Sequence, residues 1–146
     1  SNESWEHYYH RNDLLKHQSV KRSTFHKIFV DRDHSSTLAF NFAHGLMNYN
    51  NVSEFIKYQF EIGKYSTPDL YLLLDISINT SIGRQRKENV GKEWTQLKFL
   101  EKLNDFYSEE FYSLVKTAVT VVINTDCPMQ KVTAQAIEAI NKHDNE

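Results

Sequence analysis

The sequence predicts an α/β fold in which helices flank a parallel sheet. Three apolar runs of strand length are rich in β-branched and aromatic residues: Lys27–Asp31, Leu70–Asp75 and Ala118–Asn124. Their apolar character is continuous, which is typical of strands covered on both faces. The intervals between them, about forty residues each, are too long for hairpins and long enough for helical crossovers.

The first half of the chain carries three predicted helices. Glu3–Lys21 is predicted to be helical, with a cluster of aromatic residues near its start. After the strand Lys27–Asp31, apolar residues three and four apart predict helices over Thr37–Met47 and Val52–Tyr65. A loop then leads into the second strand, because the residue before Pro68 is disfavoured in a helix.

Three more helices are predicted in the second half. Ile78–Lys87 follows the strand Leu70–Asp75, and a regular apolar face predicts one long helix over Glu93–Lys116. Proline suits the first position of a helix, so the last helix is predicted to start at Pro128 and to run to Ile140.

Composition restricts the class of protein further. The 146 residues carry 40% hydrophobic residues and a formal net charge of −2, which fits one domain over residues 1–146 and gives no basic surface for nucleic acid. Cys127 is the single cysteine, so no internal disulfide is expected. No apolar run approaches the roughly 18 residues of a membrane span. We therefore expect a cytoplasmic protein with no membrane and no nucleic-acid partner.

Polar residues follow each predicted strand, where open α/β sheets bind ligands. The richest set follows the first strand. Asp31 can hold Mg²⁺, the fork of donors on Arg32 matches a phosphate, and a serine at the start of the next helix would favour an anion. An arbitrary Asp-Arg pair is more often a surface ion pair, and that alternative stays open.

A second basic element, Arg84–Lys87, follows the second strand. Such cations can neutralise charge on a phosphoryl group in transfer. Taken alone, the same run is typical of a solvated helix end, where cations suit the helix dipole. The histidines give no metal spacing, so His7 and His10 are interpreted as part of a solvated helix face.

The segment Asp31–Asn41 reads Asp-Arg-Asp-His-Ser-Ser-Thr-Leu-Ala-Phe-Asn and resembles the Asp-Arg-Tyr/His-x-x-Ser-x-x-Ala-Tyr/Phe signature of thymidylate kinases. Further along, Pro68–Asp75 resembles the family's Pro-Asp-Leu strand and Arg84–Lys87 its arginine-bearing lid helix. Val122–Asp126 resembles the strand end near the adenine. The resemblance covers nearly the whole chain in the family's order and implies a P-loop kinase-like fold.

The resemblance implies a role for each matching residue. Arg32 would hold the acceptor phosphate, and Asp31 would lie near Mg²⁺ and the transferred group, so Asp31, Arg32 and Arg86 are the predicted catalytic residues. The acceptor nucleotide would be bound by Arg32, Ser36, Phe40 and Asn41. ATP would be bound by Arg84, Arg86, Lys87 and Asp126. The implied reaction is transfer of the ATP γ-phosphoryl group to dTMP or a related nucleotide in a homodimer.

The sequence also departs from the family. Ser4 stands where the family has an arginine, and Asp33 replaces an aromatic residue or histidine. The first strand and the Gly-x-x-x-x-Gly-Lys-Ser/Thr loop are absent, since Gly63 and Gly91 precede lysines without the required earlier glycine. We expect part of a kinase whose P-loop segment is not in this sequence. A non-catalytic nucleotide-binding or interaction module and a deoxynucleoside kinase relative are the alternatives.

Overall fold

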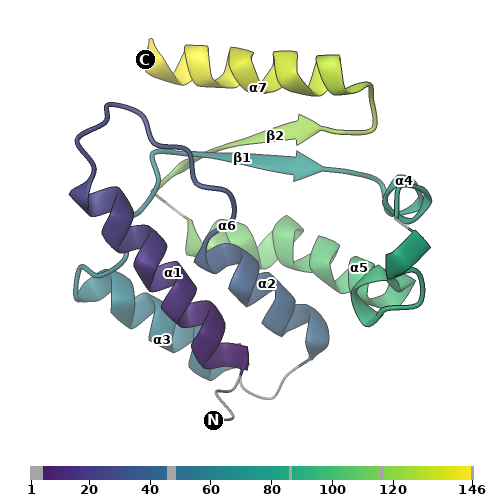
Figure 1. The fold of residues 1–146 in the computed structure, drawn as a ribbon, viewed down its shortest axis with the longest axis horizontal. Helices are drawn as coiled ribbons and strands as arrows, with labels where there is room; N and C mark the ends of the chain where they lie inside the picture. The colour runs from purple at the N-terminus through teal and green to yellow at the C-terminus, as the bar shows by residue number, and fades with distance from the viewer. Residues whose placement is uncertain (1–4, 46–48, 86, 116, 146) are drawn as a thin grey trace. The chain divides into compact units, whose positions relative to one another are not determined.

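The computed structural model describes residues 5–45, 49–85, 87–115 and 117–145. It shows a mostly helical α/β protein with a two-stranded parallel sheet packed against helices (Figure 1). The chain divides into two compact units, Ser1–Thr67 with Lys102–Leu114, and Pro68–Glu101 with Val115–Glu146.

The first unit is helical. Helix α1 (Trp5–Arg22) packs on α2 (His34–His44), and α2 packs on α3 (Tyr49–Glu61). The end of α5 (Leu97–Asp105) continues through a π-helical turn, η3 (Phe106–Glu110), which also contacts α2. The buried apolar residues of the first unit include Leu38, Ala39, Ile56, Phe106 and Phe111.

The second unit holds the sheet. Strands β1 (Leu70–Asp75) and β2 (Val119–Asn124) pair in parallel, with Leu70 opposite Val119 and Asp75 opposite Asn124. Helix α7 (Met129–Asp144) packs along this sheet, which Figure 1 shows. The parallel pairing of the second and third predicted strands is therefore confirmed.

The remaining elements of the second unit are short. Helix α4 (Ile78–Gly83) follows β1, and two 3₁₀ turns cover Lys87–Asn89 and Glu93–Thr95 before α5 begins. Helix α6 (Phe111–Leu114) is the last helix before β2 in the sequence, and it belongs to the first unit.

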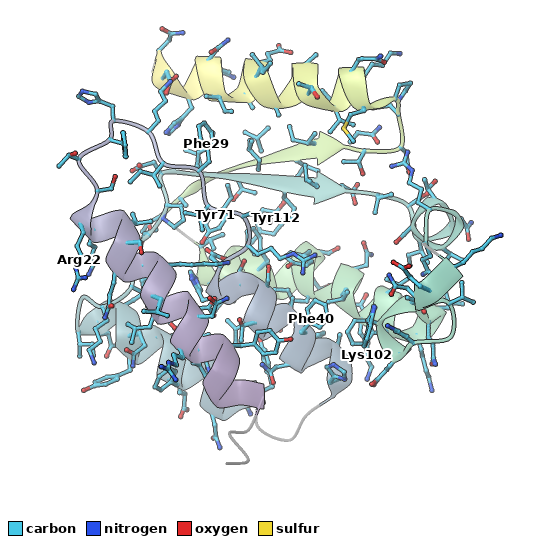
Figure 2. All side chains as sticks on the ribbon, in the orientation of Figure 1. Arg22, Phe29, Phe40, Tyr71, Lys102 and Tyr112 are labelled. Atoms are coloured by element: carbon cyan, nitrogen blue, oxygen red, sulfur yellow. The ribbon has the colours of Figure 1, made fainter. Side chains whose placement is uncertain are left out.

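The predicted first strand is wrong. Residues 23–30 form neither helix nor strand, and Phe25 and Phe29 are 80% and 74% exposed; Figure 2 labels Phe29 on this segment. A run with strand propensity becomes a strand only where a neighbouring strand pairs with it, and no such pairing is present in the described residues. Lys27–Asp31 is thus an irregular connection between α1 and α2.

Several helix boundaries also differ from the predictions. Helix α2 begins at His34 because Asp33 caps it, and α4 ends at Gly83. The long helix predicted over Glu93–Lys116 is divided: a 3₁₀ turn precedes Leu97, and a π-helical turn interrupts the hydrogen-bonding pattern. Pro128 is the residue before the first turn of α7. The predicted limits at Glu3, Met47 and Lys116 lie outside the described residues.

In the part of the chain that the structure describes, no helix has both the length and the apolar character that a membrane crossing requires.

Candidate functional site

The Asp31–Arg32 pair lies in the connection that leads into α2. Both residues are exposed. Arg32 adopts the left-handed backbone conformation, with φ of 56°, and it is the one non-glycine residue with positive φ among those described. For a residue with a Cβ atom, this conformation costs about 1–2 kcal/mol, so neighbouring contacts must hold it in place.

Lys16 on α1 supplies such contacts. Its Nζ atom donates hydrogen bonds to the carbonyl oxygens of Asp31 and Arg32, at 2.8 and 2.9 Å. A charged donor makes these bonds stronger than those between neutral groups. The main chain of the Asp31–Arg32 pair is thereby tied to α1.

Asp33 anchors the other side of the connection. Its Oδ1 atom accepts hydrogen bonds from the backbone N–H and the hydroxyl of Ser35, at 2.9 and 2.6 Å, which makes it the N-cap of α2. The residue directly after Arg32 is therefore the fixed N-cap of this helix. The helix N-terminus and the Arg32 guanidinium both favour negative charge nearby.

A buried pair of histidines lies behind this cap. His17 and His34 are 6% and 2% exposed, and His17 Nε2 lies 3.3 Å from His34 Nδ1. The backbone N–H of Ser66 donates to His17 Nδ1 at 3.0 Å. In the neutral ring, His17 Nδ1 is therefore the acceptor and Nε2 donates to His34. Burial lowers the pKa of His17 to about 4 and also lowers the pKa of His34, so both rings are neutral at pH 7.

The ring of Tyr65 stacks on His17 with the ring centroids 4.3 Å apart, and Phe60 meets His34 edge-on at 4.8 Å. These rings exclude water from the histidine pair. Burial also raises the pKa of the Tyr65 hydroxyl above its usual range.

A second buried polar contact joins α1 to α2. The hydroxyl of Thr37 donates to Asp13 Oδ2 at 2.7 Å, and both residues are buried. Burial raises the pKa of the Asp13 carboxyl to about 6, although the bond from Thr37 acts in the opposite direction. The α1–α2 interface beneath the Asp31–Arg32 pair is thus polar and hydrogen-bonded.

This interface was not predicted from the sequence. The histidines considered there were His7 and His10, whereas the buried histidines are His17 and His34. The signal available in the sequence was the spacing of Asp13 and His17, which places them on one face of a helix, toward the core.

The other predicted acceptor residues lie on α2. Ser36 is half-buried and shares a hydrogen bond with Tyr107, whose pKa is raised by burial. Phe40 is 36% exposed and is labelled in Figure 2. Asn41 is buried, and its side-chain amide donates one hydrogen bond within the helix, to the carbonyl oxygen of Thr37 at 2.9 Å.

In the second unit, residues that follow β1 contact residues that follow β2. Asp126 Oδ2 accepts a hydrogen bond from the backbone N–H of Ser77 at 3.0 Å, and this bond lowers the pKa of the Asp126 carboxyl. Thr125 donates its hydroxyl to the carbonyl oxygen of Asp75 at 2.7 Å. The exposed Arg84 donates from Nη1 to the carbonyl oxygen of Thr125 at 2.9 Å.

The structure therefore gathers the predicted residues into two groups. The first group belongs to the first unit. It consists of Asp31 and Arg32, which precede α2, and of Ser36, Phe40 and Asn41, which lie on α2. Asp31 does not end a strand. Arg84 and Asp126 lie at the carboxyl ends of β1 and β2 in the second unit. Lys87 begins a 3₁₀ turn in that unit. Arg86 lies outside the described residues.

The donor set at Asp31 restricts its metal chemistry. Within the described ranges, no group of three or more His, Cys, Asp or Glu side chains could hold a metal ion. Magnesium is usually bound by one or two carboxylates together with waters and substrate phosphates. A single exposed Asp31 fits that mode.

No protein-family model matches this chain, and neither does any curated protein or solved structure.

Proposed function

We propose that the chain carries the acceptor and lid parts of an ATP-dependent nucleoside monophosphate kinase that resembles thymidylate kinase. The observation that carries the proposal is Arg32: an exposed guanidinium on a strained, tethered main chain, directly before the capped N-terminus of α2. Strained backbone that is held by several contacts is typical of functional sites. A cation whose main chain is held beside a helix N-terminus suits a phosphate.

The reaction is transfer of the γ-phosphoryl group of ATP to dTMP or a related nucleotide. An oxygen of the acceptor phosphate forms a bond to the γ-phosphorus, and the bond from that phosphorus to the β–γ bridging oxygen breaks, which leaves ADP. Arg32 binds and orients the acceptor phosphate, so that the attacking oxygen lies in line. Mg²⁺, when bound with the phosphates near Asp31, would neutralise their charge.

The donor side of the proposal rests on the second unit. Arg84 is held against the carbonyl oxygen of Thr125 beside Asp126, at the end of β2. A planar guanidinium fixed in this way can stack on an adenine ring. Lys87, on the turn that follows, and Arg86 would supply charge to the ATP phosphates.

A second candidate function is favoured by one feature of the sequence. The 146 residues contain no Gly-x-x-x-x-Gly-Lys-Ser/Thr loop, whose backbone N–H groups and lysine cradle ATP phosphates. The second candidate is therefore a module that binds a nucleoside monophosphate without turning it over. A deoxynucleoside kinase relative would instead accept a nucleoside.

Calorimetric titration with dTMP, thymidine and ATP separates these candidates, followed by a search for ADP in a mixture of protein, ATP, Mg²⁺ and acceptor. The kinase binds dTMP and forms ADP and dTDP when it is assayed in a protein that also contains a P-loop segment. The non-catalytic module binds dTMP at micromolar affinity and forms no ADP, while the deoxynucleoside kinase relative prefers thymidine. Absence of binding to every nucleotide contradicts all three. The implied homodimer is checked by sedimentation velocity on the same sample.

A further inference from the structure

We propose that Lys16 is a positioning residue that holds the main chain of Arg32 in its left-handed conformation and so directs the guanidinium toward the acceptor phosphate. The part of this inference that concerns phosphate rests on the proposed function of Arg32. The part that concerns the backbone does not depend on any ligand. The two parts can therefore be tested separately.

The first argument is the geometry of the contact. One ammonium group binds two consecutive carbonyl oxygens, those of Asp31 and Arg32, at 2.8 and 2.9 Å. An ammonium carries three donors on a compact centre, so it can serve two carbonyls that converge on it. The two carbonyls flank the φ and ψ angles of Arg32, and holding both restricts that residue's rotation.

The second argument is that Arg32 needs such a restraint. A φ of 56° is unfavourable for arginine, whereas glycine adopts it readily. The neighbouring residue Asp33 is already fixed as the cap of α2. With α2 fixed on one side and Lys16 holding the carbonyls on the other, the conformation of Arg32 is determined from both sides.

The third argument concerns the place of Lys16. It lies in α1 between Asp13 and His17, whose side chains make the buried contacts to Thr37 and His34 on α2. Helix α1 is therefore anchored on α2 within one turn on either side of Lys16. The ammonium is presented from a rigid element, which is what precise positioning requires.

The test compares Lys16→Met with Lys21→Met in the full chain. Both substitutions remove one positive charge from α1, but Lys21 is exposed in the last turn. In Lys16→Met we expect the backbone resonances of Arg32 to move away from the values typical of the left-handed conformation. We also expect dTMP to bind about tenfold more weakly, because only the fraction with Arg32 correctly placed binds well. Lys21→Met should change neither these resonances nor the affinity for dTMP.

A thermodynamic cycle gives a readout that needs no nucleotide. Lys16→Met should raise the unfolding equilibrium constant more in the wild-type chain than in Arg32→Gly, because glycine holds a positive φ without help. Equal losses in the two backgrounds would overturn the proposal. Where Lys16→Met does not fold, Lys16→Gln enters the same cycle, since it also lacks the charge and the reach.

The outcomes distinguish this inference from the proposed function. If the wild-type chain does not bind dTMP, the proposed function fails, while the resonances and the cycle still decide the role of Lys16. If dTMP binds and Lys16→Met leaves both its affinity and the Arg32 backbone unchanged, the role of Lys16 is wrong. Equal effects of Lys16→Met and Lys21→Met would also contradict it.

Discussion

His17 Nε2 lies 3.3 Å from His34 Nδ1, and this buried contact joins the middle of α1 to the first residue of α2. The bond from Ser66 N–H to His17 Nδ1 adds the segment that follows α3. Three separate parts of the chain therefore meet on a pair of neutral rings. Protonation of either ring would replace a hydrogen bond by a buried charge.

The free energy of unfolding should depend on pH because this histidine pair is neutral in the folded state. The pKa of His17 is lowered to about 4 in the folded state from 6.5, so the unfolded chain binds the extra proton. Its contribution to stability is present above pH 6.5 and is lost as the pH falls toward 4. The wild-type chain should lose about 2 kcal/mol of unfolding free energy as the pH falls from 7.5 to 4.5, and His17→Gln should not show this loss. Urea unfolding at both pH values measures this difference, and a constant difference would contradict the neutral pair.

Asp13 should have the opposite dependence. Its pKa is raised to about 6, so the folded state holds the proton more tightly, and stability falls as the pH rises from 3.8 through 6. Asp13→Asn keeps an acceptor for Thr37 and removes the buried charge. We expect it to stabilise the protein by about 2 kcal/mol more at pH 7.5 than at pH 4.5.

The matched control for Asp13 is Asp69→Asn, which changes an exposed carboxyl. The two variants are compared by thermal unfolding across the same pH range. A stabilisation that is equal at both pH values, or that Asp69→Asn reproduces, would contradict burial as the cause.

The backbone of Arg32 makes a prediction about stability. Glycine adopts a φ of 56° readily, whereas alanine does not. Arg32→Gly should therefore be about 1 kcal/mol more stable than Arg32→Ala, the reverse of the usual order in a helix. Chemical denaturation of the two variants measures it, and a more stable alanine variant would show that residue 32 does not hold this conformation in solution.

The cap of α2 makes a separate prediction. Asp33→Ala removes the acceptor for the backbone N–H of Ser35 and should cost about 1 kcal/mol, while Asp33→Asn keeps an acceptor and should cost less. Amide hydrogen exchange in the first turn of α2 gives a local readout. Equal protection of that turn in both variants would contradict the capping role.

The sequence predicted the elements whose stability is largely local or follows from continuous apolar runs. Leu70–Asp75 and Val119–Asn124 are strands because they pair with each other in parallel and pack against α7, which partly buries their apolar side chains. Lys27–Asp31 has the same composition and is not a strand, since strand propensity cannot say whether a pairing partner is present. Pairing depends on residues far away in the sequence.

The same limit applies to the site. Asp31 and Arg32 could be chosen as candidates because the chemistry of a carboxylate and a guanidinium can be recognised in the sequence without the fold. The left-handed backbone of Arg32, its tether to Lys16 and the contact of His17 with His34 are set by tertiary packing between residues more than a dozen positions apart. Only the shared helix face of Asp13 and His17 was open to prediction from spacing.

The central claim is that Arg32 binds the phosphate of an acceptor nucleotide. The most direct measurement is the affinity of dTMP for wild type and Arg32→Ala, with Arg22→Ala as a control that removes an exposed arginine from the end of α1. Loss of a charge-assisted phosphate contact should weaken binding in Arg32→Ala, and should lower phosphoryl transfer, where it is observed, by two decades or more. Arg22→Ala should bind as wild type does. Equal dTMP affinity in wild type and Arg32→Ala would contradict the claim.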